Sequence, residues 1–89
     1  MQSTVLAKAE KARRYAGEPD RLRISRLEAT FEAGGGDHVL TYGPDGWSCD
    51  CEFFGQQRVC QHAEAASRML AKHLPEDAQL RLVDLLASA

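Results

Sequence analysis

The 89-residue sequence has no long apolar run, and no stretch approaches the roughly 18 apolar residues that a transmembrane helix requires. Charges recur every few positions near the start, so the apolar core of a signal peptide is missing as well. There is neither a glycine-rich phosphate loop with lysine nor a cluster of catalytic carboxylates. These absences predict a cytoplasmic protein that is not an enzyme, binds no small-molecule substrate and does not associate with a membrane.

An excess of positive charge is also missing, because 13 acidic residues outweigh 11 Lys and Arg for a net charge of −2. This balance argues against a strongly basic nucleic-acid binder of the histone type. The charge is nevertheless uneven: residues 1–30 carry +3 and residues 31–89 carry −5. Such asymmetry can orient a molecule on a charged partner, and it is also typical of solvated helix faces.

The length fits one small domain, whose core buries only roughly 60–65% of the surface that the unfolded chain exposes. Apolar spacing, caps and Gly or Pro breaks divide the chain into short elements. The phase of apolar residues slips near residues 25–26, which indicates a bulge or a later strand start. The spacing predicts helices over 3–16, 60–73 and 76–87, strands over 21–33 and 38–42, a hairpin loop at 34–37 and a turn at 43–46.

The informative stretch is 47–62, where all three cysteines and one of three histidines lie within fourteen residues. Cys49 and Cys51 form a C-x-C pair, and Cys60 and His62 form a C-x-H pair after a loop of eight residues. Three thiolates and one imidazole are a ligand set that zinc prefers in a closed tetrahedral site. The spacing therefore predicts one structural Zn²⁺, with one ligand pair at a strand exit and the other at a helix start.

Three alternatives compete with this interpretation. The cysteines could be unrelated buried residues, or they could form a disulfide or redox switch in a thiol sensor. A catalytic metal would need an open coordination position, which four good ligands close. The remaining histidines are weaker candidates: His73 would lie about 16 Å from His62 on one helix, and His38 sits beside the hairpin loop. Both are expected to be surface or structural histidines.

The C-x-C…C-x-H pattern is preceded by Trp47-Ser48 and contains Phe53, Phe54 and Gly55 before the helix start at Cys60. In this it closely resembles the SWIM zinc finger, over roughly residues 27–74. The resemblance implies a ββα arrangement, zinc ligation by Cys49, Cys51, Cys60 and His62, and a role in DNA binding or protein interaction. Gln61 stands where many members have Lys, and Ala63 where many have a larger aliphatic residue; losing the Lys removes one candidate phosphate contact.

The expected fold is α+β: a small zinc-stabilised ββα core at about 27–74, flanked by helices at about 3–16 and 76–87, in a single domain over 1–89. The expected function is DNA binding. The alternative, from a different class, is a protein-interaction or accessory role for a larger ATPase or recombination-type protein. Any nucleic-acid contacts are expected away from the acidic knuckle around Asp50 and Glu52, at Lys8, Lys11, Arg13, Arg14, Arg21, Arg23, Arg26 and Arg58.

Overall fold

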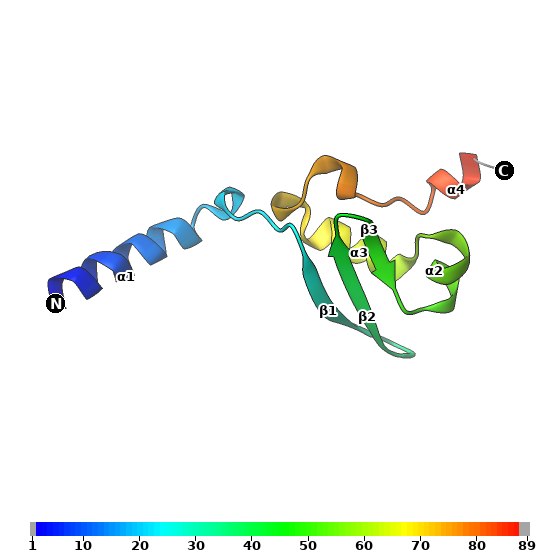
Figure 1. Ribbon diagram of the computed structural model, residues 1–89, viewed down its shortest axis with the longest axis horizontal. Coiled ribbons are helices and arrows are strands. Elements are labelled where there is room, and N and C mark those ends of the chain that lie inside the picture. Colours follow the sequence, from blue (N-terminus) through cyan, green and yellow to red (C-terminus); the bar gives the residue numbers. More distant parts are fainter. Residues whose placement is uncertain (1, 88–89) are drawn as a thin grey trace.

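A three-stranded antiparallel sheet and the helices behind it form the folded core of the computed structural model, which describes residues 2–87 (Figure 1). The strands lie side by side in chain order: β1 (Leu27–Ala33), β2 (Gly36–Gly43) and β3 (Gly46–Cys49). The α-helices are α1 (Gln2–Ala16), α2 (Glu52–Gln57), α3 (Gln61–Met69) and α4 (Asp84–Ala87), and short 3₁₀ helices lie at Pro19–Arg21, Ala71–His73 and Glu76–Ala78. The predicted α+β fold is confirmed. No helix within the described residues is long and apolar enough to cross a bilayer.

The core lies between one face of the sheet and helices α2 and α3. Leu40 pairs with Cys49 across β2 and β3, and both side chains are buried on this inner face. Opposite them, α3 contributes Ala63 and Ala66, whose small side chains allow the helix to approach the strands closely. Such a core buries few large side chains, so its apolar area alone stabilises the fold modestly.

The first helix does not join this core. Every residue from 3 to 16 is exposed, and α1 projects from the sheet as an arm (Figure 1). The radius of gyration is 17.3 Å, against about 12 Å for a compact domain of this length. The helix itself was expected, but a compact shape is wrong. Whether the whole chain acts as one domain stays a prediction.

The expected strand over 21–33 begins only at Leu27, which agrees with a later start after the slip in phase. Residues before it hydrogen-bond elsewhere: the Ile24 N–H donates to the carbonyl of His73 at 2.7 Å. No helix or strand was expected between the turn at 43–46 and the helix at 60–73, yet β3 and α2 form there. Both elements are too short to show a hydrophobic period, because β3 has four residues and α2 has six.

The two C-terminal helices are shorter than expected. The helix predicted over 60–73 ends at Met69, and the one predicted over 76–87 is a 3₁₀ turn, an extended segment and the four residues of α4. Tertiary hydrogen bonds hold this extended segment along α3, since Gln79 Nε2 donates to the Ser67 carbonyl at 2.7 Å. The Trp47 indole N–H donates to the Ala78 carbonyl at 2.8 Å, which ties the segment to the sheet. These bonds outweigh the local helical pattern.

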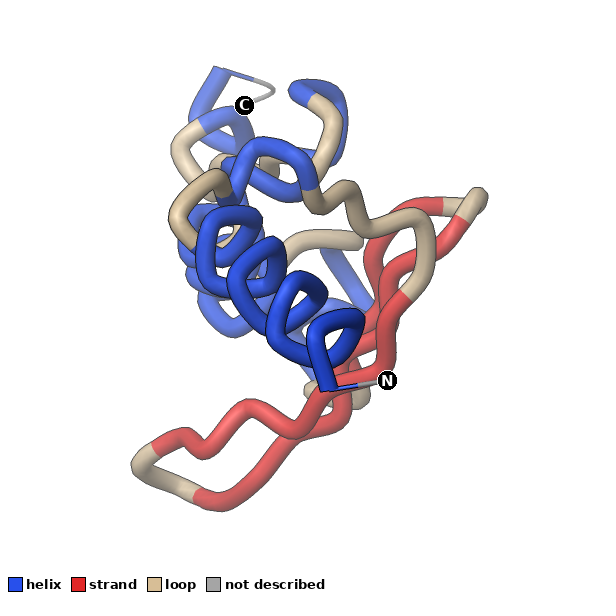
Figure 2. The backbone as a smooth tube through the Cα atoms, turned by 90° about the vertical axis from the view of Figure 1, so that its left-hand side faces the viewer, coloured by secondary structure: helices blue, strands red, loops and turns tan. Residues whose placement is uncertain are grey.

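The β1–β2 hairpin extends beyond the helical layer, on the side away from the C-terminal segment (Figure 2). Its register pairs Phe31 with His38 and Glu32 with Asp37. Side chains alternate between faces along each strand, so Phe31 and His38 lie on the inner face beside the start of α3. The hairpin therefore supplies one wall of the site described next.

Candidate metal centre

The four ligands expected from the sequence converge. The donor atoms of Cys49, Cys51, Cys60 and His62 all lie within 4.8 Å of one another. Cys49 ends β3, Cys51 precedes α2, Cys60 precedes α3 and His62 lies in the first turn of α3. Cys49, Cys60 and His62 are buried, Cys51 is half-buried, and none of the three cysteines forms a disulfide. The arrangement is consistent with one bound metal ion such as zinc.

Two of the ligands are helix N-caps, which explains how the local sequence places them. The Phe54 N–H donates to Cys51 Sγ at 3.4 Å, and the Ala63 N–H donates to Cys60 Sγ at 3.3 Å. A sulfur in this position satisfies a backbone N–H that a helix start would otherwise leave unpaired. The partial positive charge of the helix N-terminus also favours the thiolate over the thiol.

The turn between the helices brings the two ligand pairs together. Arg58 ends α2 in the left-handed conformation at φ 63°, and it is the one non-glycine residue with positive φ among those described. Its N–H donates to the Phe54 carbonyl at 2.8 Å. Most residues avoid this conformation, so the turn is held by the structure on both sides of it.

Two of the distances between donor atoms are close to the edge length of a tetrahedral zinc site. His62 Nδ1 lies 3.8 Å from Cys49 Sγ and 3.8 Å from Cys60 Sγ. Typical zinc–sulfur and zinc–nitrogen bonds at a tetrahedral angle separate the two atoms by about 3.6 Å. Both contacts are long for hydrogen bonds but near the edge length of a zinc site. The nitrogen directed at the cysteines is Nδ1.

Without a metal, burial keeps the inner thiols protonated. Burial, with the other two cysteines nearby, raises the pKa of Cys49 to about 12. Burial also raises the pKa of Cys60. Burial acts in the same direction on the pKa of Cys51, but the Phe54 N–H and the neighbouring cysteines outweigh it, so this pKa lies below its ordinary value. A metal that binds here must displace protons from the buried thiols.

His38 lies much closer to the centre than the sequence indicated. Its ring stacks on that of His62, with centroids 4.3 Å apart, and Phe31 packs against His62 at 5.4 Å. The Nδ1–H of His38 donates to Asp50 at 2.9 Å, and this bond lowers the pKa of the Asp50 carboxyl. The donor atoms of His38, Cys49 and Asp50 also lie within 4.8 Å of one another. The available signal was the strand register, which sets His38 two residues before the partner of Cys49.

His73 has the structural role expected of it, although it is not on the same helix as His62. It lies in the 3₁₀ helix after α3, and its Nδ1–H donates to the Leu22 carbonyl at 3.1 Å. Together with the Ile24 bond to its own carbonyl, this contact fixes the segment that leads into β1.

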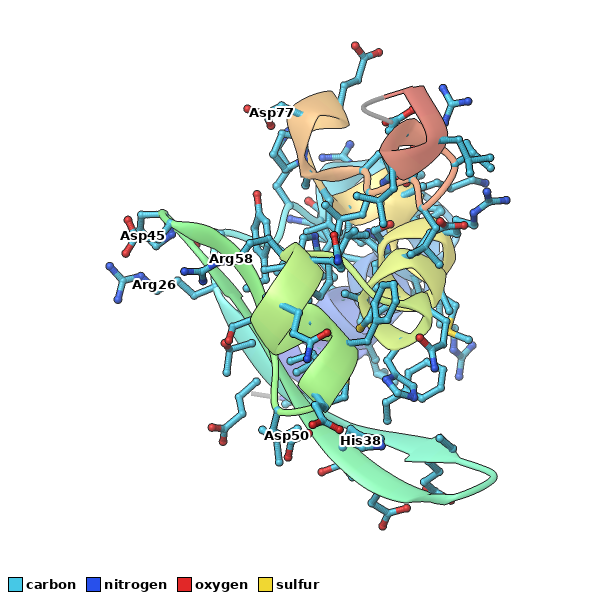
Figure 3. All side chains as sticks on the ribbon, turned by 90° about the vertical axis from the view of Figure 1, so that its right-hand side faces the viewer. Arg26, His38, Asp45, Asp50, Arg58 and Asp77 are labelled. Atoms are coloured by element: carbon cyan, nitrogen blue, oxygen red, sulfur yellow. The ribbon has the colours of Figure 1, made fainter. Side chains whose placement is uncertain are left out.

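The expected nucleic-acid contacts fall in separate regions. Lys8, Lys11, Arg13 and Arg14 lie on α1, whereas Arg26 and Arg58 line a hollow beside the β2–β3 turn. Figure 3 shows Arg26, Arg58 and Asp45 near one end of the sheet, with His38 and Asp50 toward the other. Arg21 is engaged locally, since it pairs with Glu18 at 2.9 Å and lies over the Tyr15 ring. Arg23 lies in the exposed segment before β1.

Comparison with protein-family models, with curated proteins and with solved structures finds no match for this chain.

Zinc binding to the metal-free, reduced protein is expected to release two to three protons near pH 7. Cys49 and Cys60 are protonated there because their pKa values are raised, whereas Cys51 is closer to ionisation. The apparent affinity falls as the pH falls, because protons compete with the metal for the thiolates. Calorimetric titration in buffers of different ionisation enthalpy counts the released protons. Zinc binding that releases no protons would contradict ligation by these thiols, and His73→Gln serves as a control with an unchanged count.

Proposed function

We propose that this chain is a zinc-binding module of the SWIM type, in which Cys49, Cys51, Cys60 and His62 hold one structural Zn²⁺. The observation that carries the proposal is the convergence of four donor atoms within 4.8 Å, in a ligand set that zinc favours. Three free cysteines at such a centre suit a reducing compartment, which supports a cytoplasmic location.

A structural role fits the site better than a catalytic one. Four protein ligands complete a tetrahedron and leave no position for water or substrate. Structural zinc supplies apparent binding free energies of about 10–16 kcal/mol, which become folding free energy when the site forms only in the folded chain. A small core built on alanines and buried cysteines depends on such a contribution. Neither an enzyme nor a thiol sensor is proposed.

We propose protein interaction as the role of the module, with a larger ATPase or recombination-type protein as the partner class that the SWIM resemblance implies. The separation of the basic residues supports this choice, because α1 and the Arg26–Arg58 hollow do not form one surface for a nucleic-acid backbone. Zn²⁺ with three thiolates and a neutral imidazole would carry −1, and Asp50 and Glu52 flank it. Phosphates are repelled from that region.

DNA binding is the second candidate, and α1 is the feature that favours it. This helix carries four basic residues and one acidic residue, all exposed. Such a helix can contact phosphates without reading bases.

Loss of one ligand is expected to remove zinc and unfold the region of β2, β3 and α3. Cys49→Ser and Cys60→Ser leave a site with three ligands, which binds zinc more weakly than the complete set. The lost metal contribution, about 10–16 kcal/mol, is as large as the stability of about 5–15 kcal/mol that is typical of a whole domain. Zinc content by mass spectrometry and thermal unfolding by circular dichroism measure both effects. Ser48→Ala, on the exposed outer face of β3, is the matched control. A Cys variant that keeps native zinc content and melting temperature would show that the ligand assignment is wrong.

The DNA candidate makes a quantitative prediction for fluorescence anisotropy of the zinc-loaded protein on labelled duplexes. If each of the four basic side chains of α1 contacts a phosphate, the logarithm of the association constant falls with the logarithm of the salt concentration with a slope near −3.6. Lys8→Ala with Lys11→Ala reduces the steepness by about 2 units, and Arg81→Ala leaves it unchanged. Absence of binding at about 50 mM salt, where such contacts are strongest, rejects this candidate.

A further inference from the structure

Helix α1 is exposed on all sides, although it has an apolar stripe. Val5, Ala9, Ala12 and Ala16 recur at helical spacing along one side, and Val5 is 66% exposed. A helix of 15 residues without tertiary packing is marginal in water, because propagation barely offsets nucleation. Burial of the stripe against another surface would stabilise the helix.

That surface is not the sheet of the same chain. The segment after α1 is held to the helical layer through His73, which bonds to Leu22 and Ile24. The arm therefore leaves the core from the side where α3 lies, and it points away from the sheet (Figure 1).

The outer face of the sheet is uncovered and apolar at its centre. It is acidic toward the β1–β2 turn, while Arg26 and Arg58 border Glu28 at its other end. Glu28, Thr30 and Glu32 project from β1, opposite Thr41, Val39 and Asp37 of β2. Val39 is 44% exposed. Residues 27–57 contain six acidic residues and no Lys or Arg. Glu32 and Asp37 lie directly opposite one another, an arrangement that destabilises a sheet unless a cation lies near.

The arm and this face complement each other in charge and pattern. Residues 2–16 have a net charge of +3, from four basic residues and one acidic residue. At about 100° per residue, Lys8 and Arg13 flank the apolar stripe at about 70° on either side. They match a face on which acids border Val39 and the threonine methyl groups.

We propose that α1 docks on the outer sheet face of a second copy of this chain, and that the exchange is reciprocal and forms a homodimer. Each apolar stripe then covers the partner's Val39, while Lys8 and Arg13 meet Glu28 and Glu32. Direct pairing of two α1 helices would bring two charges of +3 together, which opposes that arrangement. The proposal needs a folded sheet but does not depend on which metal stabilises it. Lys11 and Arg14 face away from the docked surface.

Sedimentation equilibrium of the zinc-loaded protein at low salt tests this proposal. The wild type is expected to shift from 9.8 kDa toward twice that mass as its concentration rises, and about 0.5 M salt weakens the association. Lys8→Glu with Arg13→Glu reverses the charge beside the apolar stripe of the helix. Glu28→Lys with Glu32→Lys reverses the charge of the sheet face. Each double variant alone brings like charges together and is expected to associate at least about tenfold more weakly.

An equimolar mixture of the two double variants gives the decisive result. Both contacts in the mixed dimer pair opposite charges again, so the mixture is expected to recover the dimer that neither variant forms alone. Lys72→Glu and Glu76→Lys change charge outside both surfaces and are the matched controls, with unchanged mass expected. Circular dichroism and zinc content verify that every variant is folded.

A wild type that stays monomeric up to about 1 mM overturns the proposal, and so does a mixture that stays monomeric although the wild type dimerises. The first result would leave α1 to fold onto its own chain or to bind another protein. The second would place the dimer contact elsewhere.

Discussion

The constraint on which the rest of the structure depends is the meeting of three thiols and one imidazole within 4.8 Å, inside the core of a small fold. Cys49 and Cys60 are core residues as well as ligands, so the site and the core form together. Each thiol reaches the centre from a strand end or a helix N-cap. The consecutive elements β3, α2 and α3 bring these ligands together. The proposed Zn²⁺ joins the sheet to α3, whose buried core residues Ala63 and Ala66 are small.

Charge organises the remainder of the chain. The strands and the knuckle carry only acidic charges, which the proposed metal centre increases, while the basic residues gather mainly in α1 and the segment after it. This separation disfavours one continuous nucleic-acid surface and leaves two surfaces of opposite charge, an arm and an open sheet face. The hydrogen bonds of His73 hold the base of the arm against the helical layer, so the arm itself projects away from the sheet.

Sequence reasoning succeeded where the signal was local and chemical. Ligand spacing identified the cluster, and the predicted loop at 34–37 and turn at 43–46 match the two turns around β2. It failed where tertiary contacts decide: the helix expected over 76–87 is replaced by a segment bonded to Ser67 and Trp47. Helix α2 was missed because six residues are too short for a period, and its Cys51 cap is not a common capping residue. The position of His38 over His62 required the register of the hairpin, which composition does not define. The projection of α1 could not be predicted from its own stripe, because that stripe would equally suit a packed helix.

X-ray absorption at the zinc edge of the purified, reduced protein tests the central claim most directly. The account predicts one zinc per chain with three sulfur neighbours at about 2.3 Å and one nitrogen at about 2.0 Å. His62→Ala, like the Cys variants, is expected to lose zinc, while His73→Gln leaves the zinc content and the spectrum unchanged. A first shell dominated by oxygen, or a reduced and folded protein that binds no zinc, would contradict the account.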